Sequence, residues 1–262
     1  MPDIATKIIS IPEDNINISF KELEDLIKID PGLTTKILKV ANSALYARQT
    51  EVTSLQKAIT LLGFKTIKSL VFLVSASNMF YKRSNQDFYN YFWKHSIPTA
   101  FMAKDIARRC GFRRILDESF LAGLLHDIGR IAMFQSDPDR YISTRGIDDE
   151  RKVFGADHKE VGEAILSSWN FPAVYVDTAR EHGSLNITSE HKTIILIVSA
   201  ADLLSSYITE SPFSENDDDL LDAIMLRLNL KEEDKIFYTE EFIGELQQIP
   251  MFRECNSLFS LN

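Results

Sequence analysis

The chain has 262 residues, of which 45% are hydrophobic and 26% charged, so it is an ordinary globular sequence, long enough for one large domain or two smaller ones. Its formal net charge of −9 argues against nucleic acid as a partner, because attraction to phosphate backbones needs a basic face. Two distant cysteines, no basic and apolar leader, and apolar runs shorter than the roughly 20 residues that span a bilayer predict a cytoplasmic protein without a membrane segment.

Apolar residues recur at helical spacing along most of the chain, and sustained strand alternation is almost absent, which predicts an all-α fold. In the N-terminal part, Thr53 and Gln56 predict a capping box that opens a helix through Leu62. Gly63 then supplies a left-handed stop before another helix begins near Lys65. A DNA-binding helix-turn-helix is the alternative, but the apolar junction at Gly63 favours scaffold packing.

The most polar break of the first half lies at residues 81–87, where we place a boundary between subdomains. A long helix is expected over residues 87–110, and Gly111 stops it. Pro98 lies inside this helix and removes one backbone hydrogen bond, so it should kink the helix just after His95. The kink is expected to aim His95 inward.

The next helix carries the pair His126-Asp127 and is expected to end before Pro138, while residues 143–156 are predicted to form a charged loop. Further helices are expected at residues 159–169, 172–181 and 193–207. The acidic run at residues 215–219 is predicted to be a loop that caps a helix starting near Leu220. We therefore expect an N-terminal helical subdomain at residues 1–85, a helical core at 86–210 and a C-terminal helical extension at 211–262.

Six ionisable residues lie in or beside apolar helical stretches, where burial is costly unless the group is paired or bound to a metal. They are His95, His126, Asp127, His158, His182 and Asp202. Imidazole and carboxylate groups are favoured ligands of iron, manganese and zinc, so the set predicts a site for one or two divalent ions. Taken singly, the histidines also have structural interpretations: His95 as a core side chain, His158 as a helix-start neighbour, and His182 at a helix end where a cation meets the dipole.

The order of His95, His126-Asp127 and Asp202 resembles the HD superfamily of metal-dependent phosphohydrolases, and the wider context resembles its HDOD branch. Matching landmarks run over roughly residues 20 to 207 and include Asn42-Ser43, Ala58, Leu61-Leu62-Gly63, Trp93-Lys94-His95-Ser96, the segments 120–129 and 155–162, Trp169, Pro172 and Ala201-Asp202. The resemblance implies an all-helical HD core preceded by a helical subdomain. It also implies a bacterial signalling or regulatory module, a class mostly described without catalytic activity.

The HD-GYP cyclic-di-GMP phosphodiesterases are similar through His126-Asp127, His158, His182 and Asp202, with three departures. Where those enzymes carry two histidines, this chain has Glu181-His182, so Glu181 either replaces a ligand or disables a second metal position. No Gly-Tyr-Pro segment follows Gly183, and Arg130 stands in place of the usual lysine. Arginine keeps the positive charge but changes the geometry offered to phosphate.

Two functions remain open. In the first, the chain is a regulatory HDOD protein that acts through a signalling protein partner, and any metal supports the structure. In the second, it is a phosphohydrolase in which a metal-activated water attacks a nucleotide or cyclic dinucleotide, with Asp127 and Arg130 as catalytic residues. The missing Gly-Tyr-Pro segment and the family background favour the regulator.

Overall fold

The computed structural model describes residues 6–8, 11, 16–43, 52–80, 86–209 and 217–259. Within these segments every regular element is helical, which confirms the all-α prediction. The polar break is described only from residue 86 onward, and the acidic run only from residue 217 onward.

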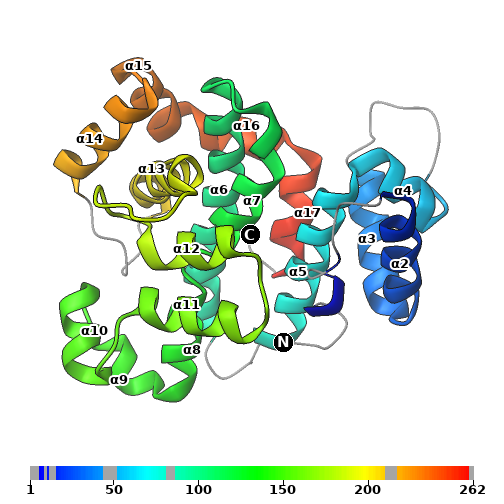
Figure 1. Ribbon diagram of the computed structural model, residues 1–262, viewed down its shortest axis with the longest axis horizontal. Coiled ribbons are helices and arrows are strands. Elements are labelled where there is room, and N and C mark those ends of the chain that lie inside the picture. The colour runs from blue at the N-terminus through cyan, green and yellow to red at the C-terminus, as the bar shows by residue number, and fades with distance from the viewer. Residues whose placement is uncertain are drawn as a thin grey trace. The chain divides into compact units, whose positions relative to one another are not determined.

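The contacts divide the chain into two compact units, of which the first comprises residues 1–86, 169–171 and 247–262. Its helices are α2 (Ile16–Lys28), α3 (Pro31–Ser43), α4 (Leu55–Leu62), α5 (Phe64–Phe80) and α17 (Pro250–Leu258). The C-terminal helix α17 packs against α3 and α5, and Lys39 pairs with Glu254 at 2.9 Å (Figure 1). The C-terminal end of the chain therefore belongs to the same unit as the N-terminal helices.

The second unit comprises residues 87–168 and 172–246. It includes α6 except for its first residue and α16 except for its last two residues. Its elements are α6 (Gln86–Arg109), η2 (Arg113–Ile115), α7 (Leu116–Leu125), α8 (Ile128–Ser136), α9 (Pro138–Ile142), α10 (Gly146–Phe154), α11 (His158–Ser168), α12 (Ala173–Glu181), α13 (Lys192–Thr209), α14 (Asp218–Leu228), α15 (Glu232–Ile236), the π-helix η3 (Phe237–Glu241) and α16 (Phe242–Gln248). Helix α11 packs against α8 and α12, and α13 packs against α7, α12 and α14. These packed helices form the frame on which the candidate site is built.

The helix α4 is capped by Ser54 and not by Thr53, which corrects the predicted capping box. The Ser54 hydroxyl accepts a hydrogen bond from the Lys57 backbone N–H at 3.3 Å. Gly63 ends the helix with a positive φ of 85°, as expected of a glycine stop, but its ψ of 156° lies outside the left-handed helical region. Helix α5 begins at the next residue.

Replacing Ser54 by alanine should lower the free energy of unfolding by about 1 kcal/mol, because the α4 terminus loses its side-chain acceptor. The matched control is Thr53→Ala, since Thr53 is exposed and is not the cap. Urea denaturation of both variants measures the difference. Equal losses would contradict the assignment of the cap to Ser54.

Two local predictions in the second unit are wrong. Residues 143–156 do not form a loop, because α10 covers Gly146–Phe154, with acidic residues in its first turn, basic residues in its last, and Gly155 in the left-handed conformation at its end. The pair His126-Asp127 does not lie within a helix either, since α7 ends at Leu125 and α8 begins at Ile128. Both residues lie in the turn between the two helices.

The helix α6 continues through Pro98 as one element of 24 residues and carries His95 on its buried face. Phe88 of the same helix stacks on Phe134 of α8, with ring centroids 3.7 Å apart and an interplanar angle of 5°. Such a contact fixes the distance between α6 and the segment that follows the His126-Asp127 turn.

By length and hydropathy, α13 could cross a membrane, but 61% of the residues of that window are buried within the protein. The bent pair formed by α4 and the first part of α5 also passes the same test of composition. Core helices of globular proteins pass it too, and α13 packs against α7, α12 and α14.

Candidate metal centre

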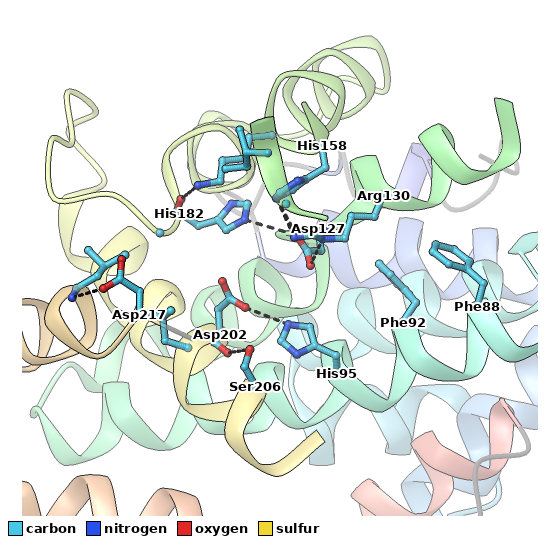
Figure 2. Close-up of a pocket in the computed structure, with 16 residues that line it drawn as sticks. Phe88, Phe92, His95, Asp127, Arg130, His158, His182, Asp202, Ser206 and Asp217 are labelled. Atoms are coloured by element: carbon cyan, nitrogen blue, oxygen red, sulfur yellow. Dashed lines mark hydrogen bonds and ion pairs between the residues drawn. The ribbon is translucent and has the colours of Figure 1, made fainter. Parts of the chain in front are cut away.

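The six predicted residues come together in the second unit, from four helices and one turn, and Figure 2 labels all of them except His126. His95 lies on α6, His126-Asp127 in the turn after α7, His158 at the start of α11, His182 at the end of α12 and Asp202 on α13. The four histidines and Asp127 are at most 5% exposed, and the side chain of Asp202 is 20% exposed. Sequence positions more than a hundred residues apart therefore form one buried polar cluster.

The donor atoms of this cluster lie at separations typical of ligands that share a metal ion. His95 Nε2 is 3.0 Å from Asp202 Oδ1, and His126 Nε2 is 3.5 Å from the same oxygen. Asp127 Oδ1 lies 3.5 Å from His182 Nε2 and 3.4 Å from His158 Nε2. Ligands about 2.0–2.2 Å from one ion in a tetrahedral arrangement are roughly 3.4 Å apart, so these distances suit coordination without rearrangement.

Each histidine is oriented by a hydrogen bond at Nδ1, which leaves Nε2 directed into the cluster. His126 Nδ1 donates to the Gly123 carbonyl at 2.7 Å, and His182 Nδ1 lies 3.0 Å from the Ala179 carbonyl. His158 Nδ1 donates to Glu150 Oε2 at 2.6 Å, and His95 Nδ1 lies 3.2 Å from the Ser205 hydroxyl. Metal-ligating histidines almost always use their second ring nitrogen in this way, because the bond fixes the tautomer and the ring orientation.

Two buried atoms of the cluster have no hydrogen-bond partner among the described residues: His126 Nε2 and Asp127 Oδ1. A buried polar atom left unpaired costs about 1–3 kcal/mol. His126 Nε2 lies 3.5 Å from Asp202 Oδ1, and Asp127 Oδ1 lies 3.5 Å from His182 Nε2, so both atoms face other donors of the cluster and a divalent ion there would bind them. The residues present therefore fit a metal of the iron, manganese or zinc type.

The electrostatics of the cluster also suit a cation. Burial lowers the pKa of His126, but the charges of Asp127 and Asp202 outweigh it and raise that pKa to about 9. Burial raises the pKa of Asp127, yet Arg130 and His126 hold it well below its usual range, and His126 and His95 do the same for Asp202 against its burial. Both carboxylates are thus ionised at neutral pH, and the cluster carries negative charge.

Glu150 is a site residue that was not predicted from the sequence; it lies on α10 and is 1% exposed. Its carboxylate accepts from the His158 backbone N–H at 2.9 Å and from Tyr141 at 3.2 Å, in addition to the His158 ring. Arg130 donates to it at 3.2 Å and to Asp127 at 2.7 Å. A buried acid eight residues before a histidine in a charged segment was the available signal, but burial itself is not visible in the sequence.

A pocket of about 150 Å³ opens onto the cluster. Besides the donors it is lined by Phe92, Arg130, Lys159 and Asp217, some of which Figure 2 labels. The Lys159 ammonium donates to the His182 carbonyl at 2.6 Å, and burial lowers its pKa. The volume is below the roughly 300 Å³ of sites that bind drug-sized ligands, so the space suits an ion with a small anion.

Glu181 does not join the cluster. Its carboxylate instead accepts hydrogen bonds from the backbone N–H groups of Thr188 and Ser189, at 3.0 and 3.2 Å. Of the two alternatives for Glu181, replacement of a metal ligand is therefore contradicted by the geometry.

Comparisons with known proteins place this arrangement in a family. An uncharacterized protein of Treponema pallidum (strain Nichols) is 24% identical over 228 residues, which is 82% of this chain but 44% of that protein. The chain thus spans less than half the length of this relative. Two solved structures share the fold. The first, with a TM-score of 0.76, is a candidate signal transduction protein of Marinobacter aquaeolei VT8; it is 20% identical, and the match covers 99% of this chain and 59% of that chain. The second, with a TM-score of 0.66, is a candidate metal-dependent phosphohydrolase of Shewanella amazonensis SB2B; it is 22% identical, and the match covers 98% of this chain and 91% of that chain.

A family model, the HDOD domain, matches residues 1–185, which include the N-terminal helices and all of the six clustered residues except Asp202. This confirms the resemblance that the sequence landmarks indicated. The chain belongs to the HDOD domain family.

Proposed function

We propose that the chain is a regulatory HDOD protein of a bacterial signalling pathway, which acts by contacting a partner protein and whose HD core holds a divalent metal ion for structural support. The observation that carries this proposal is that the guanidinium of Arg130, the cation beside the donors, is already bound to protein groups. Its Nε is bound to Asp127 and its Nη1 to Glu150, while Nη2 lies 3.3 Å from His158 Nε2. A phosphate in the pocket would meet a guanidinium already engaged by protein groups.

The metal has a structural role in this proposal. When bound, it would neutralise Asp127 and Asp202 and join residues of α6, α12, α13 and the turn after α7. The orphaned His126 Nε2 and Asp127 Oδ1 would gain a partner. Family membership and the likeness to a candidate signal transduction protein support the regulatory part, and the partner protein is a proposal.

The alternative function is that of a metal-dependent phosphohydrolase. It is favoured by the pocket, because Lys159 and the donor cluster line the same space of about 150 Å³. Here the ion would supply Lewis-acid activation of water, and Asp127 would help to orient the ion while Arg130 and Lys159 faced the phosphate. The small volume argues for a compact phosphate ester over a cyclic dinucleotide.

Removing the metal is expected to lower the melting temperature of the wild-type protein by about 5–10 °C, since a ligand at a hundred times its Kd stabilises by about 2.7 kcal/mol. Elemental analysis of protein purified without chelator or affinity-tag metal should find iron, manganese or zinc. Thermal denaturation before and after chelation measures the shift. The double variant His126→Ala/Asp127→Ala should contain no metal. The variant Asp202→Asn removes the charge of a donor beside His126 but keeps the size of its side chain, so it separates the loss of a metal ligand from a loss of packing.

Hydrolysis distinguishes the two functions. Metal-loaded wild type and Asp202→Asn are incubated with bis(p-nitrophenyl) phosphate and a nucleotide panel. A regulator should give equal, background rates for both proteins. Turnover by the wild type that disappears in Asp202→Asn would contradict the regulator and support the phosphohydrolase.

A further inference from the structure

We infer that the guanidinium of Arg130 stands in place of a second metal cation, so that the HD core holds one divalent ion and not two. The inference rests on the proposed metal site and concerns its stoichiometry. Arg130 lies on α8, three residues after Asp127, and its side chain is 13% exposed. In Figure 2 it approaches Asp127 from the same side as His158, which is the side away from His95 and Asp202.

The guanidinium of Arg130 contacts carboxylate and imidazole groups, which are the ligand types that a second divalent ion would bind. Its Nε lies 2.7 Å from Asp127 Oδ2, so the guanidinium takes one carboxylate oxygen and leaves Oδ1 for an ion. Its Nη1 lies 3.2 Å from Glu150 Oε1, and its Nη2 lies 3.3 Å from His158 Nε2. A bridging carboxylate, a second carboxylate and an imidazole are thereby all bound to one positive group.

The tautomer of His158 follows from its partners. Glu150 Oε2 also accepts the His158 backbone N–H, and Glu150 Oε1 is paired with Arg130, so the carboxylate acts as the acceptor and His158 Nδ1 carries the proton of the 2.6 Å bond. The lone pair is then on Nε2, where it accepts from Arg130 Nη2. This is the lone pair with which His158 would ligate a metal, and Arg130 already occupies it.

The remaining donors point to a single position for the ion. Two groups of three residues among those described could hold a metal: one contains His95, His126 and Asp202, the other His126, Asp127 and His182. Both contain His126, and neither contains His158. His126 Nδ1 is bound to the Gly123 carbonyl, so His126 has only the Nε2 lone pair for a metal and the two groups cannot each hold an ion with it at the same time. The His126 side of the cluster is therefore the metal position, and the His158 side is the position filled by Arg130.

Charge balance agrees with one ion. A histidine that binds a metal is neutral, so the carboxylates of Asp127, Asp202 and Glu150 are balanced by Arg130 together with a single divalent cation. Lys159 already adds one positive charge at the pocket. A second divalent ion would leave three uncompensated positive charges in a largely buried site, which is unfavourable unless anions accompany it.

The test is the number of metal ions bound. Chelated protein is titrated with Mn²⁺ by calorimetry, and the loaded protein is then assayed by elemental analysis and by electron paramagnetic resonance. Wild type should bind one equivalent and show isolated Mn²⁺. Arg130→Gln should bind a second equivalent and show the signal of a spin-coupled pair, whereas Arg130→Lys keeps the charge and should remain at one.

The matched control is Arg140→Gln on the neighbouring helix α9, where the side chain is 62% exposed; it should bind one equivalent. Two equivalents in the wild type would overturn the inference whether or not the variants fold, and would leave the proposed metal site intact. One equivalent in both wild type and a folded Arg130→Gln would also overturn it. No metal in the wild type would instead contradict the proposed function.

Discussion

Replacing Gly129 by alanine is expected to lower the free energy of unfolding by at least about 3 kcal/mol, the upper end of what overpacking usually costs. A Cβ atom at this position would lie 1.9 Å from the His158 carbonyl oxygen and 2.7 Å from the Gly162 backbone nitrogen. These are backbone atoms of α11, which has no side-chain rotamer with which to move aside. The helices α8 and α11 would have to separate.

The same contact positions the candidate site. Gly129 follows Asp127 by two residues, and His158 is the first residue of α11, so the close approach of the two backbones sets the 3.4 Å distance between Asp127 Oδ1 and His158 Nε2. Asp127 is a donor of the proposed metal position and lies two residues before Gly129, so any Gly129→Ala protein that folds should also bind metal more weakly.

The control for this substitution is Gly244→Ala in α16. A Cβ there meets nothing within 4 Å and the position is exposed, so the variant should be more stable than wild type by about 0.5–1 kcal/mol through its higher helix propensity. Urea denaturation monitored by circular dichroism measures both. A loss of less than 1 kcal/mol for Gly129→Ala would show that α8 and α11 are not in the contact described.

The helices and site residues that could be predicted are those marked by a local pattern in the sequence. Helical spacing of apolar residues predicted α6, α11, α12 and α13 to within a few residues, and ionisable groups in these apolar stretches pointed to the cluster. The order of His95, His126-Asp127 and Asp202 indicated the family. That the six residues form one site was inferred from their residue types and from the resemblance; spacing alone does not predict it, since the packing of four helices and a turn is a tertiary property.

The features that the sequence did not predict have a common physical cause. Residues 146–154 are rich in charge, which predicts a solvated loop, yet the charges lie at the two ends of α10 and Glu150 faces inward between them. The turn at His126-Asp127 interrupts a continuous apolar run, so periodicity gave no break there. Nor did any local pattern indicate that α17 packs in the first unit. In each case contacts distant in sequence decided the structure.

Replacing Glu150 by alanine is expected to lower the free energy of unfolding by about 3–5 kcal/mol, the cost of removing one partner of a buried ion pair. Arg130 would lose the carboxylate 3.2 Å from its Nη1 and keep only Asp127. The backbone N–H and ring Nδ1 of His158 would lose their acceptor at 2.9 and 2.6 Å.

The measurement should be made on chelated protein, because only then does the loss report the buried network and not a weakened metal. The control is Asp148→Ala on the same helix; Asp148 is exposed, so its removal should change stability by no more than about 0.5 kcal/mol. A Glu150→Ala protein as stable as this control would mean that Arg130 is adequately balanced by Asp127 alone. That result would also weaken the case for Arg130 as a second cation, since the acid that helps to anchor it would be dispensable.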